Sequence, residues 1–596
     1  MTGQAPNLGL RDLVRRDGVG PVWCDGREIL RRIFVTVRDA NWKEVPPTQW
    51  NSEIDEGQRT ATLTARHVSD SVDFEWKGTL RVSDDSRSLR FEVVGQVLRD
   101  MEVCRLGLVV LHPVESMVGS SVAAVGPEAG HRMTVGEIIA PQPVVGGIPQ
   151  AMTEPFSKLI VERTDFGRAE FQFEGDLFEL EDQRNWGDGS FKSYCTPLRL
   201  GFPRGVRAGA VIAQSVEVRF GEYGGNEVAG NSTRGAVSAR SRASRSEGLK
   251  SQHFMWAKDR LTDAAGVFPR IGREWRLTSP FERQGLDAGA PRWDHLYVEA
   301  GRERLAALRA LLESVGSTRI ALGIEAGDDG PSAEMVGFLL ENRERIARVL
   351  LCGARTSLVS NGIVERWRQD LVARDGQWAV PLLATTRGYF VEFNRGLAFD
   401  PEVSGIAFPM SATVHSDDAE TICDGVPAIR DMVETGRRLT GVEEVVVAPL
   451  ALYHPRSVAG ERFPRELVAP WLVAVLINAA LVRVASVSLA EDVLDLVAAS
   501  GACAPKFISE LVECSGHEMT LLEAELPHGL HGVVFASGAS NRGRALLANL
   551  TSRSASISLS RVGLRASTAR DAVTGKSVGI NTGHVEIPAF GVMCLG

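Results

Sequence analysis

The chain lacks several features that mark common classes of protein. Its 596 residues carry a net charge of −9, so it has no basic excess of the kind that phosphate binding requires. Its eight cysteines are scattered, with no close pair at metal-ligand spacing, and we expect them to be reduced. No serine-hydrolase elbow, His-x-x-x-His pair or Cys-x-x-Cys pair is recognisable. These absences argue against a nucleic-acid partner, a zinc site and a serine hydrolase of that type.

Long apolar runs are also missing. Residues 1–10 are polar and have no apolar core of the kind that a signal peptide needs. The most apolar stretch, residues 467–484, is interrupted by Pro470 and Asn478. A membrane helix needs about 20 largely apolar residues. We therefore expect a cytoplasmic protein without a membrane partner, in which this stretch forms a buried helix.

The first part of the chain has the alternating apolar and polar pattern that is typical of a β-sandwich. Between about residues 22 and 220, apolar and polar residues alternate in short runs such as 78–83 and 89–94, separated by turn residues. Residues 224–250 are rich in Gly, Ser, Ala and Arg and cannot bury enough apolar surface to become ordered. The sequence therefore predicts an N-terminal β-sandwich domain over 1–223 and a flexible linker over 224–250.

The second part of the chain alternates apolar strands with amphipathic helices. Seven strands are expected, at 295–299, 319–325, 349–352, 381–385, 405–408, 445–449 and 482–488. This regular alternation of strands and helices favours a (β/α)₈ barrel over an open doubly wound sheet. We expect the eighth strand between 500 and 525. Strand-like alternation returns at 532–537, 544–549, 556–560 and 584–588. We thus predict a barrel domain over 251–525 and a small C-terminal β-sandwich over 526–596.

The most informative stretch is an acidic run with one aromatic residue at 181–190, Glu-Asp-Gln-Arg-Asn-Trp-Gly-Asp-Gly-Ser. Carboxylates, an arginine, an amide and an aromatic face are the groups that bind a hydroxyl-rich small molecule such as a sugar derivative. On this interpretation the run packs over the barrel mouth, and Asp182, Arg184, Asn185 and Trp186 bind substrate. The alternative is a solvated turn in which the arginine pairs with neighbouring carboxylates.

Titratable residues also gather where the expected barrel strands end, which is where barrel enzymes place their chemistry. A histidine beside carboxylates, as at His415-Ser416-Asp417-Asp418, suits a general base or a metal pocket. Each residue also has a structural interpretation, such as a first-turn acid that caps a helix. The catalytic candidates are Glu392, His415 and Glu491, and the further substrate-binding candidates are Glu325, Asn394, Arg395 and His454.

The acidic run resembles the signature of the D-apionate lactonase family, bacterial proteins that hydrolyse a branched-chain aldonolactone. Short stretches at 111–113, 389–395, 414–418, 547–551 and 587–590 agree with that family in the same order. The resemblance implies a carbohydrate-metabolism hydrolase that opens an apionolactone-like ester with water activated by a carboxylate or His415. Arg and Asn donors would stabilise the oxyanion. No cofactor is predicted, and a divalent metal held by carboxylates stays open because such sites leave little sequence trace.

Two other functions stay open. Glu392 and Glu491 follow the fourth and seventh expected strands, where retaining glycosidases with this barrel carry their two carboxylates. A glycoside hydrolase is therefore the second candidate. Near Glu491 the chain departs from the family's pattern, because Leu489 and Ala490 stand where relatives carry aromatic residues. A catalytically inactive carbohydrate-binding relative is the third.

Overall fold

The computed structural model describes most of the chain. The described residues are 6, 8–24, 26–127, 130–163, 167–221, 265–277, 291–326, 330–353, 358, 362–376, 378–395, 403–453, 462–522, 526–535, 544–562, 564 and 566–596. The predicted linker lies outside them. Within this part of the chain, no helix is long and apolar enough to cross a membrane.

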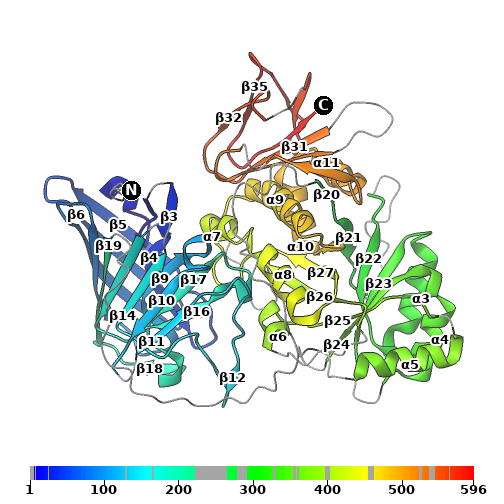
Figure 1. Cartoon of the computed structure of the whole chain (residues 1–596), viewed down its shortest axis with the longest axis horizontal. Coiled ribbons are helices and arrows are strands. Elements are labelled where there is room, and N and C mark those ends of the chain that lie inside the picture. Colours follow the sequence, from blue (N-terminus) through cyan, green and yellow to red (C-terminus); the bar gives the residue numbers. More distant parts are fainter. Residues whose placement is uncertain are drawn as a thin grey trace, which may run out of the picture.

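The N-terminal region is a sandwich of two antiparallel sheets (Figure 1). One sheet has the strand order β1 (Gly18–Val19), β4 (Arg32–Asp39), β9 (Met101–Pro113), β17 (Ser190–Tyr194) and β16 (Glu179–Asp182), with β18 (Arg204–Val206) also on β9. The other runs β11 (Gly130–Thr134), β10 (Ser121–Val125), β14 (Lys158–Arg163), β15 (Gly167–Glu174), β19 (Val211–Gly221), β8 (Ser88–Val97), β7 (Asp73–Val82), β6 (Thr60–Val68) and β5 (Pro47–Asp55). Apolar side chains of both sheets form one core, which confirms the predicted β-sandwich.

The burial of each strand follows its sequence pattern. In β7, Phe74, Trp76 and Leu80 are buried while Glu75 and Lys77 are exposed, because successive side chains point to opposite faces. Strand β9 is buried along almost its whole length, on both faces. One face of its sheet lines the sandwich core, and the other meets a loop of the barrel. This second face carries part of the candidate site.

Short elements complete the region. They are α1 (Leu10–Leu13), α2 (Val114–Met117) and the two-stranded sheets β2 (Val22–Cys24) with β3 (Arg27–Leu30) and β12 (Val144–Val145) with β13 (Ile148–Pro149).

A closed barrel of eight parallel strands follows. Its strands are β21 (Arg270–Glu274), β22 (His295–Glu299), β23 (Arg319–Glu325), β24 (Ile346–Cys352), β25 (Leu382–Thr385), β26 (Gly405–Ser411), β27 (Glu444–Ala451) and β28 (Ser486–Leu489). The helices between and after them are α3 (Leu305–Ser314), α4 (Ala333–Glu341), α5 (Ile363–Asp375), α6 (Phe390–Arg395), α7 (Ala419–Asp424), α8 (Ala428–Thr440), α9 (Val468–Leu481), α10 (Glu491–Ser500) and α11 (Ala504–Glu513). The predicted barrel and its seven expected strands are confirmed.

The position expected for the eighth strand is wrong. The missing strand is β21, which comes before the first expected strand and pairs with both β22 and β28. Residues 500–525 instead contribute α11 and a strand of the C-terminal sheet. Counted from β21, Glu392 follows the fifth strand and Glu491 the eighth. The argument that they occupy the fourth and seventh positions of a retaining glycosidase therefore fails.

The C-terminal strands form a seven-stranded sheet above the barrel in Figure 1. Its order is β20 (Ala265–Val267), β29 (Glu518–Leu521), β30 (Leu530–Phe535), β31 (Arg544–Asn549), β36 (Val592–Leu595), β33 (Ala569–Asp571) and β34 (Ser577–Val578). The pair β32 (Ala555–Ser558) and β35 (His584–Ile587) accompanies it. Strands β20 and β29 belong to this sheet although they fall within 251–525. The domain limits themselves stay a prediction.

The most apolar stretch of the sequence forms α9, and nearly every one of its side chains is buried. Its residues belong to the same apolar core as those of β28 in the barrel and β31 in the C-terminal sheet. The expected buried helix is thus confirmed.

Candidate functional site

The acidic run lies between the β-sandwich and the barrel and is almost completely buried. Residues Gln183–Trp186 form a 3₁₀ turn between β16 and β17. The Arg184 side chain, 1% exposed, donates hydrogen bonds to both carboxylate oxygens of Asp182 and pairs with Asp431 of α8 at 3.3 Å. It also donates to the carbonyl oxygens of Gly136 and Glu137. Asp182 and Arg184 therefore join the two parts of the molecule rather than face solvent.

The amides at the centre of the run continue this internal network. The Asn394 amide nitrogen on α6 donates to the Asn185 side-chain oxygen at 2.9 Å and to the Ile139 carbonyl at 3.2 Å. Asn185 in turn donates to the Ala140 carbonyl at 2.7 Å. Both asparagines are buried. The structure brings these two predicted substrate-binding residues together, but it places them beneath the surface.

Trp186 differs from its neighbours because its indole is partly exposed. The ring centroids of Trp186 and Tyr389 lie 5.1 Å apart, and those of Trp186 and His415 lie 5.5 Å apart. The Arg395 guanidinium lies 5.9 Å from the indole centroid. We call the partly exposed residues Trp186, Tyr389, Glu392, Arg395 and His415 the Trp186 cluster. The cluster brings a predicted residue of the acidic run, Trp186, together with predicted residues that follow the adjacent barrel strands β25 and β26.

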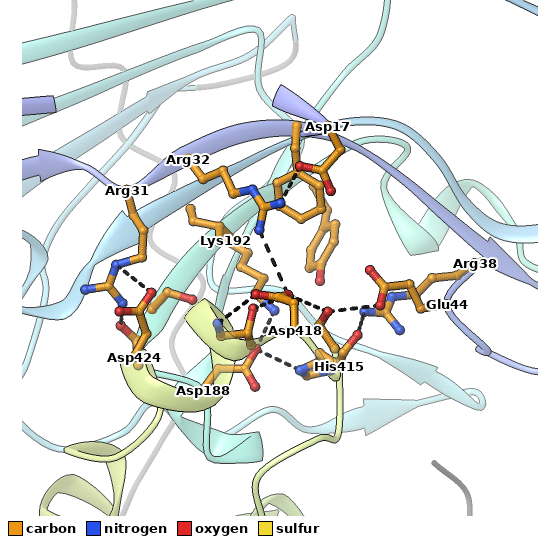
Figure 2. A pocket seen from close by; sticks show the side chains of 17 residues that line it. Asp17, Arg31, Arg32, Arg38, Glu44, Asp188, Lys192, His415, Asp418 and Asp424 are labelled. Atoms are coloured by element: carbon orange, nitrogen blue, oxygen red, sulfur yellow. Dashed lines mark hydrogen bonds and ion pairs between the residues drawn. The ribbon is translucent and has the colours of Figure 1, made fainter. Parts of the chain in front are cut away.

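His415 is held by a carboxylate of the acidic run. Its Nδ1 lies 2.9 Å from Oδ2 of Asp188, and the ammonium of Lys192 pairs with the same oxygen. Figure 2 shows these three side chains together in the small cavity between the sandwich and the barrel. Burial lowers the pKa of His415 to about 4 despite the Asp188 carboxylate, so the imidazole is neutral at pH 7. Although burial opposes its ionisation, His415 and Lys192 lower the pKa of Asp188 below its ordinary range.

This pairing corrects the sequence interpretation of the carboxylates beside His415. Asp418 accepts from the Thr421 backbone N–H at 2.9 Å and so caps α7, while Asp417 pairs with Arg462. The carboxylate that meets the imidazole is Asp188, 227 residues earlier in the chain. Asp188 and Lys192 both lie in or beside the acidic run, but no sequence signal joined them to His415.

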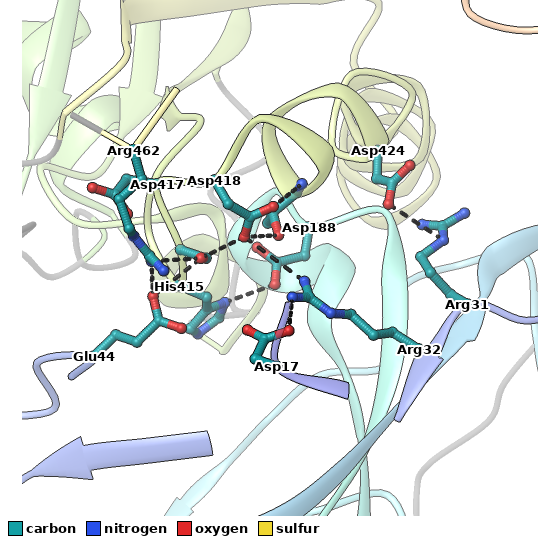
Figure 3. Close-up of polar contacts among 12 residues, drawn as sticks. Asp17, Arg31, Arg32, Glu44, Asp188, His415, Asp417, Asp418, Asp424 and Arg462 are labelled. Atoms are coloured by element: carbon teal, nitrogen blue, oxygen red, sulfur yellow. Dashed lines mark hydrogen bonds and ion pairs between the residues drawn. The ribbon is translucent and has the colours of Figure 1, made fainter. Parts of the chain in front are cut away.

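The loop that carries His415 is tied to the sandwich by further polar contacts (Figure 3). Arg38 of β4 donates to the His415 carbonyl at 2.7 Å, and Arg31 lies 3.5 Å from Asp424. Arg462 pairs with Glu44 on the sandwich side. The backbones also approach closely, since a Cβ on Gly189 would lie 1.9 Å from the Asp424 carbonyl oxygen. Position 189 therefore requires glycine.

Glu392 has a structural contact as well as a place in the cluster. Its Oε2 accepts from the Tyr389 backbone N–H at 2.6 Å, which caps the start of α6. Its Oε1 lies 3.8 Å from the Arg395 guanidinium, and Arg395 also donates to the side-chain oxygen of Gln142 at 2.9 Å. The Glu392 side chain is 25% exposed. It therefore remains partly open to solvent beside Arg395, the residue whose guanidinium lies over the Trp186 indole.

Two of the remaining predicted residues, Glu325 and Glu491, lie at or after the ends of other strands of the barrel. Glu325 ends β23 and pairs with Arg387 at 2.5 Å. Arg387 also lies 3.4 Å from Glu299, which accepts a hydrogen bond from the buried Tyr297 hydroxyl. Glu491 is exposed in the first turn of α10. His454 lies outside the described residues.

A carboxyl that sequence reasoning missed ends the first barrel strand. Burial raises the pKa of Glu274, and the carboxylates of Glu299, Asp492 and Glu491 add to that effect. It was missed because β21 itself was not expected. Among the described residues, no group of three or more His, Cys, Asp or Glu side chains is placed to hold a metal ion.

Comparisons with known proteins bear on the sandwich. Residues 10–223 match the family described as D-apionate lactonase, N-terminal domain. The resemblance to this family is confirmed. A D-apionate lactonase of Brucella anthropi is 29% identical to this chain over 208 residues, which are 34% of this chain and 32% of the relative. The match thus spans about a third of that relative's length.

Solved structures give a much weaker likeness. An α-galactosidase of Geobacillus stearothermophilus aligns over 94% of this chain and 89% of its own, with 10% identity and a TM-score of 0.26. An α-galactosidase of Lactobacillus brevis aligns over 94% and 87%, with 8% identity and a TM-score of 0.27. At such scores neither alignment bears on the activity of this chain.

Proposed function

We propose that the chain is a hydrolase that opens a sugar-derived lactone of the apionolactone type. One observation carries the proposal. The region that matches the D-apionate lactonase N-terminal domain supplies Trp186 and Asp188 to a site whose histidine stands on the barrel. A neutral imidazole, an arginine and an aromatic face can together activate water, stabilise an oxyanion and hold a sugar ring, which is what ester opening on such a ring needs.

The chemistry assigned to the site is general-base catalysis. His415 donates its Nδ1–H to Asp188, so Nε2 carries a lone pair that can take a proton from water. The hydroxide attacks the lactone carbonyl, and the Arg395 guanidinium stabilises the oxyanion. When the ring C–O bond breaks, the imidazolium returns its proton to the leaving alkoxide. Trp186 supports the sugar ring, and Glu392 holds Arg395.

A panel of substrates tests the proposal. We expect the wild type to release protons from one or more aldonolactones, D-apionolactone among them, above the spontaneous rate, and to release no chromophore from aryl glycosides. Chromophore release without lactone opening would favour a glycosidase. Silence in both assays, with sugar-acid binding detected by calorimetry, would leave a carbohydrate-binding relative.

Loss of the aromatic face should weaken substrate binding. An aromatic contact contributes about 0.5–1.5 kcal/mol, so we expect Trp186→Ala to raise KM about twofold to tenfold with a smaller change in kcat. Steady-state kinetics on the best lactone measures this. Trp42→Ala is the matched control, because Trp42 is 40% exposed and lies in the β4–β5 connection of the sandwich. Equal KM values for Trp186→Ala and wild type would remove Trp186 from the binding site.

Glu392→Gln separates the charge of this residue from its capping contact. Glutamine keeps an oxygen for the Tyr389 N–H but loses the negative charge that faces Arg395. Because Glu392 holds the arginine that stabilises the oxyanion, we expect kcat to fall by about 10²-fold, at the lower end of the range for loss of an oxyanion donor, with an unchanged melting temperature. Glu434→Gln on the exposed face of α8 is the control and should leave kcat unchanged. Near-wild-type turnover of Glu392→Gln would show that Glu392 only caps the helix.

A further inference from the structure

Lys192 is a buried ammonium with an assigned partner but no role in the chemistry above. Its side chain on β17 is 6% exposed and pairs with Oδ2 of Asp188, the oxygen that also faces Nδ1 of His415. One carboxylate oxygen therefore lies between two cationic or potentially cationic groups. We propose that Lys192 is a positioning residue that keeps His415 neutral, with its proton on Nδ1 and a free Nε2.

Charge counting in the buried triad supports this assignment. Lys192 and Asp188 together are neutral, so a neutral His415 leaves no net charge among the three side chains. A protonated His415 would leave one uncompensated positive charge, which is costly away from water. A histidine paired with an aspartate alone would behave in the opposite way, because an unshared carboxylate favours the imidazolium. The lysine therefore acts together with burial to keep the base neutral, by offsetting the one carboxylate that would favour the imidazolium.

The other charged groups around His415 act in the same direction or are already paired. Arg38 of β4 donates to the His415 carbonyl, and its positive charge also disfavours the imidazolium. Arg462 pairs with Asp417 and Glu44, and Asp418 faces Arg32 at 4.0 Å and the Thr421 N–H. Trp186 packs edge-on against the imidazole and brings no charge to it. Asp188 is therefore the carboxylate that meets the imidazole, and Lys192 neutralises it.

The inference extends the proposed lactonase site, and its consequence is a pH dependence. In the wild type, His415 should stay unprotonated well below its ordinary pKa of about 6.5, so activity should persist to acidic pH. Lys192→Met removes the ammonium and leaves His415 facing an uncompensated Asp188. The imidazole should then hold its proton at higher pH. The apparent pKa of the acid limb of the kcat/KM profile should therefore be higher by at least about one unit than in the wild type. At pH values below both apparent pKa values, this corresponds to a tenfold lower kcat/KM.

The experiment combines nitrogen NMR of ¹⁵N-histidine-labelled full-length protein with pH–rate profiles. The His415 signal is assigned from its absence in His415→Gln. We expect a neutral, Nδ1-protonated ring at pH 7 in the wild type, a titration midpoint at least one unit higher in Lys192→Met, and a wild-type midpoint in Lys192→Arg. An unchanged midpoint in Lys192→Met, or an upward shift in Lys192→Arg as large, would overturn the proposal.

Two features keep the result decisive. If Lys192→Met does not fold, Lys192→Gln carries the same test, because it also removes the ammonium: a midpoint at least one unit above wild type supports the proposal, and an unchanged midpoint overturns it. The NMR readout needs no turnover. A chain that opens no lactone would therefore overturn the proposed function while the protonation state of His415 is still measured. A purely structural role for Lys192 would lower activity equally at all pH values.

Discussion

His415→Ala is expected to lower kcat/KM for lactone opening by about 10²–10⁴-fold, the contribution of an essential general base. The Nε2 of His415 is the proposed proton acceptor, and the methyl group of alanine cannot accept a proton in its place. We expect the melting temperature to change little, because the side chain is partly exposed and, among the described residues, its hydrogen-bond partner is Asp188. Initial rates of proton release and thermal unfolding of the same preparations measure both effects.

His584→Ala is the matched control for that substitution. His584 is exposed on β35, which pairs with β32 beside the C-terminal sheet, and its ring contacts the Thr582 carbonyl. Its loss should leave kcat/KM unchanged. If His415→Ala keeps more than a tenth of wild-type activity, His415 is not the base. A large loss of melting temperature together with activity would make it a structural residue of the interface.

Arg184→Met is expected to destabilise the protein by about 3–5 kcal/mol, the usual cost of removing one partner from a buried ion pair. The substitution leaves the carboxylates of Asp182 and Asp431 without their guanidinium, and it removes donors to two backbone carbonyls. Urea unfolding followed by circular dichroism measures the change. The sequence alone had suggested a weaker substrate affinity instead. The buried position makes stability the expected readout.

Arg11→Met provides the comparison at the surface. Arg11 pairs with Glu56 at 3.1 Å, but these side chains are 82% and 55% exposed. Such pairs contribute about 0–1 kcal/mol, so this variant should unfold at nearly the wild-type urea concentration. Equal stability of Arg184→Met and Arg11→Met, with a raised KM for the former alone, would return Arg184 to the binding residues.

The sequence predicted the barrel because its strands are short apolar runs between amphipathic helices. It missed β21 because Arg270-Ile-Gly-Arg-Glu274 has no such run. The reason for glycine at position 272 is a contact with the neighbouring strand, which the sequence does not show. A Cβ at that position would lie 2.5 Å from Nε2 of His295, the buried side chain of the neighbouring strand. This strand is thus fitted to its neighbour by a small residue opposite a histidine, and it lacks the apolar run by which the other strands were predicted.

The site was predictable in composition but not in contacts. The acidic run was recognised as unusual, yet its polar residues were expected at a surface. They are buried because α6 and α8 supply partners such as Asn394 and Asp431. Likewise, His415 was selected with the wrong carboxylates. Of the carboxylates next to His415 in sequence, Asp417 pairs with Arg462 and Asp418 caps α7. The carboxylate that contacts the imidazole is Asp188, which lies far away in the sequence.

The central claim is that a carboxylate of the sandwich and a histidine of the barrel act as one catalytic unit. A double-mutant cycle in kcat/KM with Asp188→Asn, His415→Gln and the double variant tests it most directly. All variants are first compared with the wild type by thermal unfolding. If Asp188 acts through His415, the double variant should be no slower than His415→Gln alone. Losses that multiply in the double variant would show that the two residues act independently, and would contradict the account.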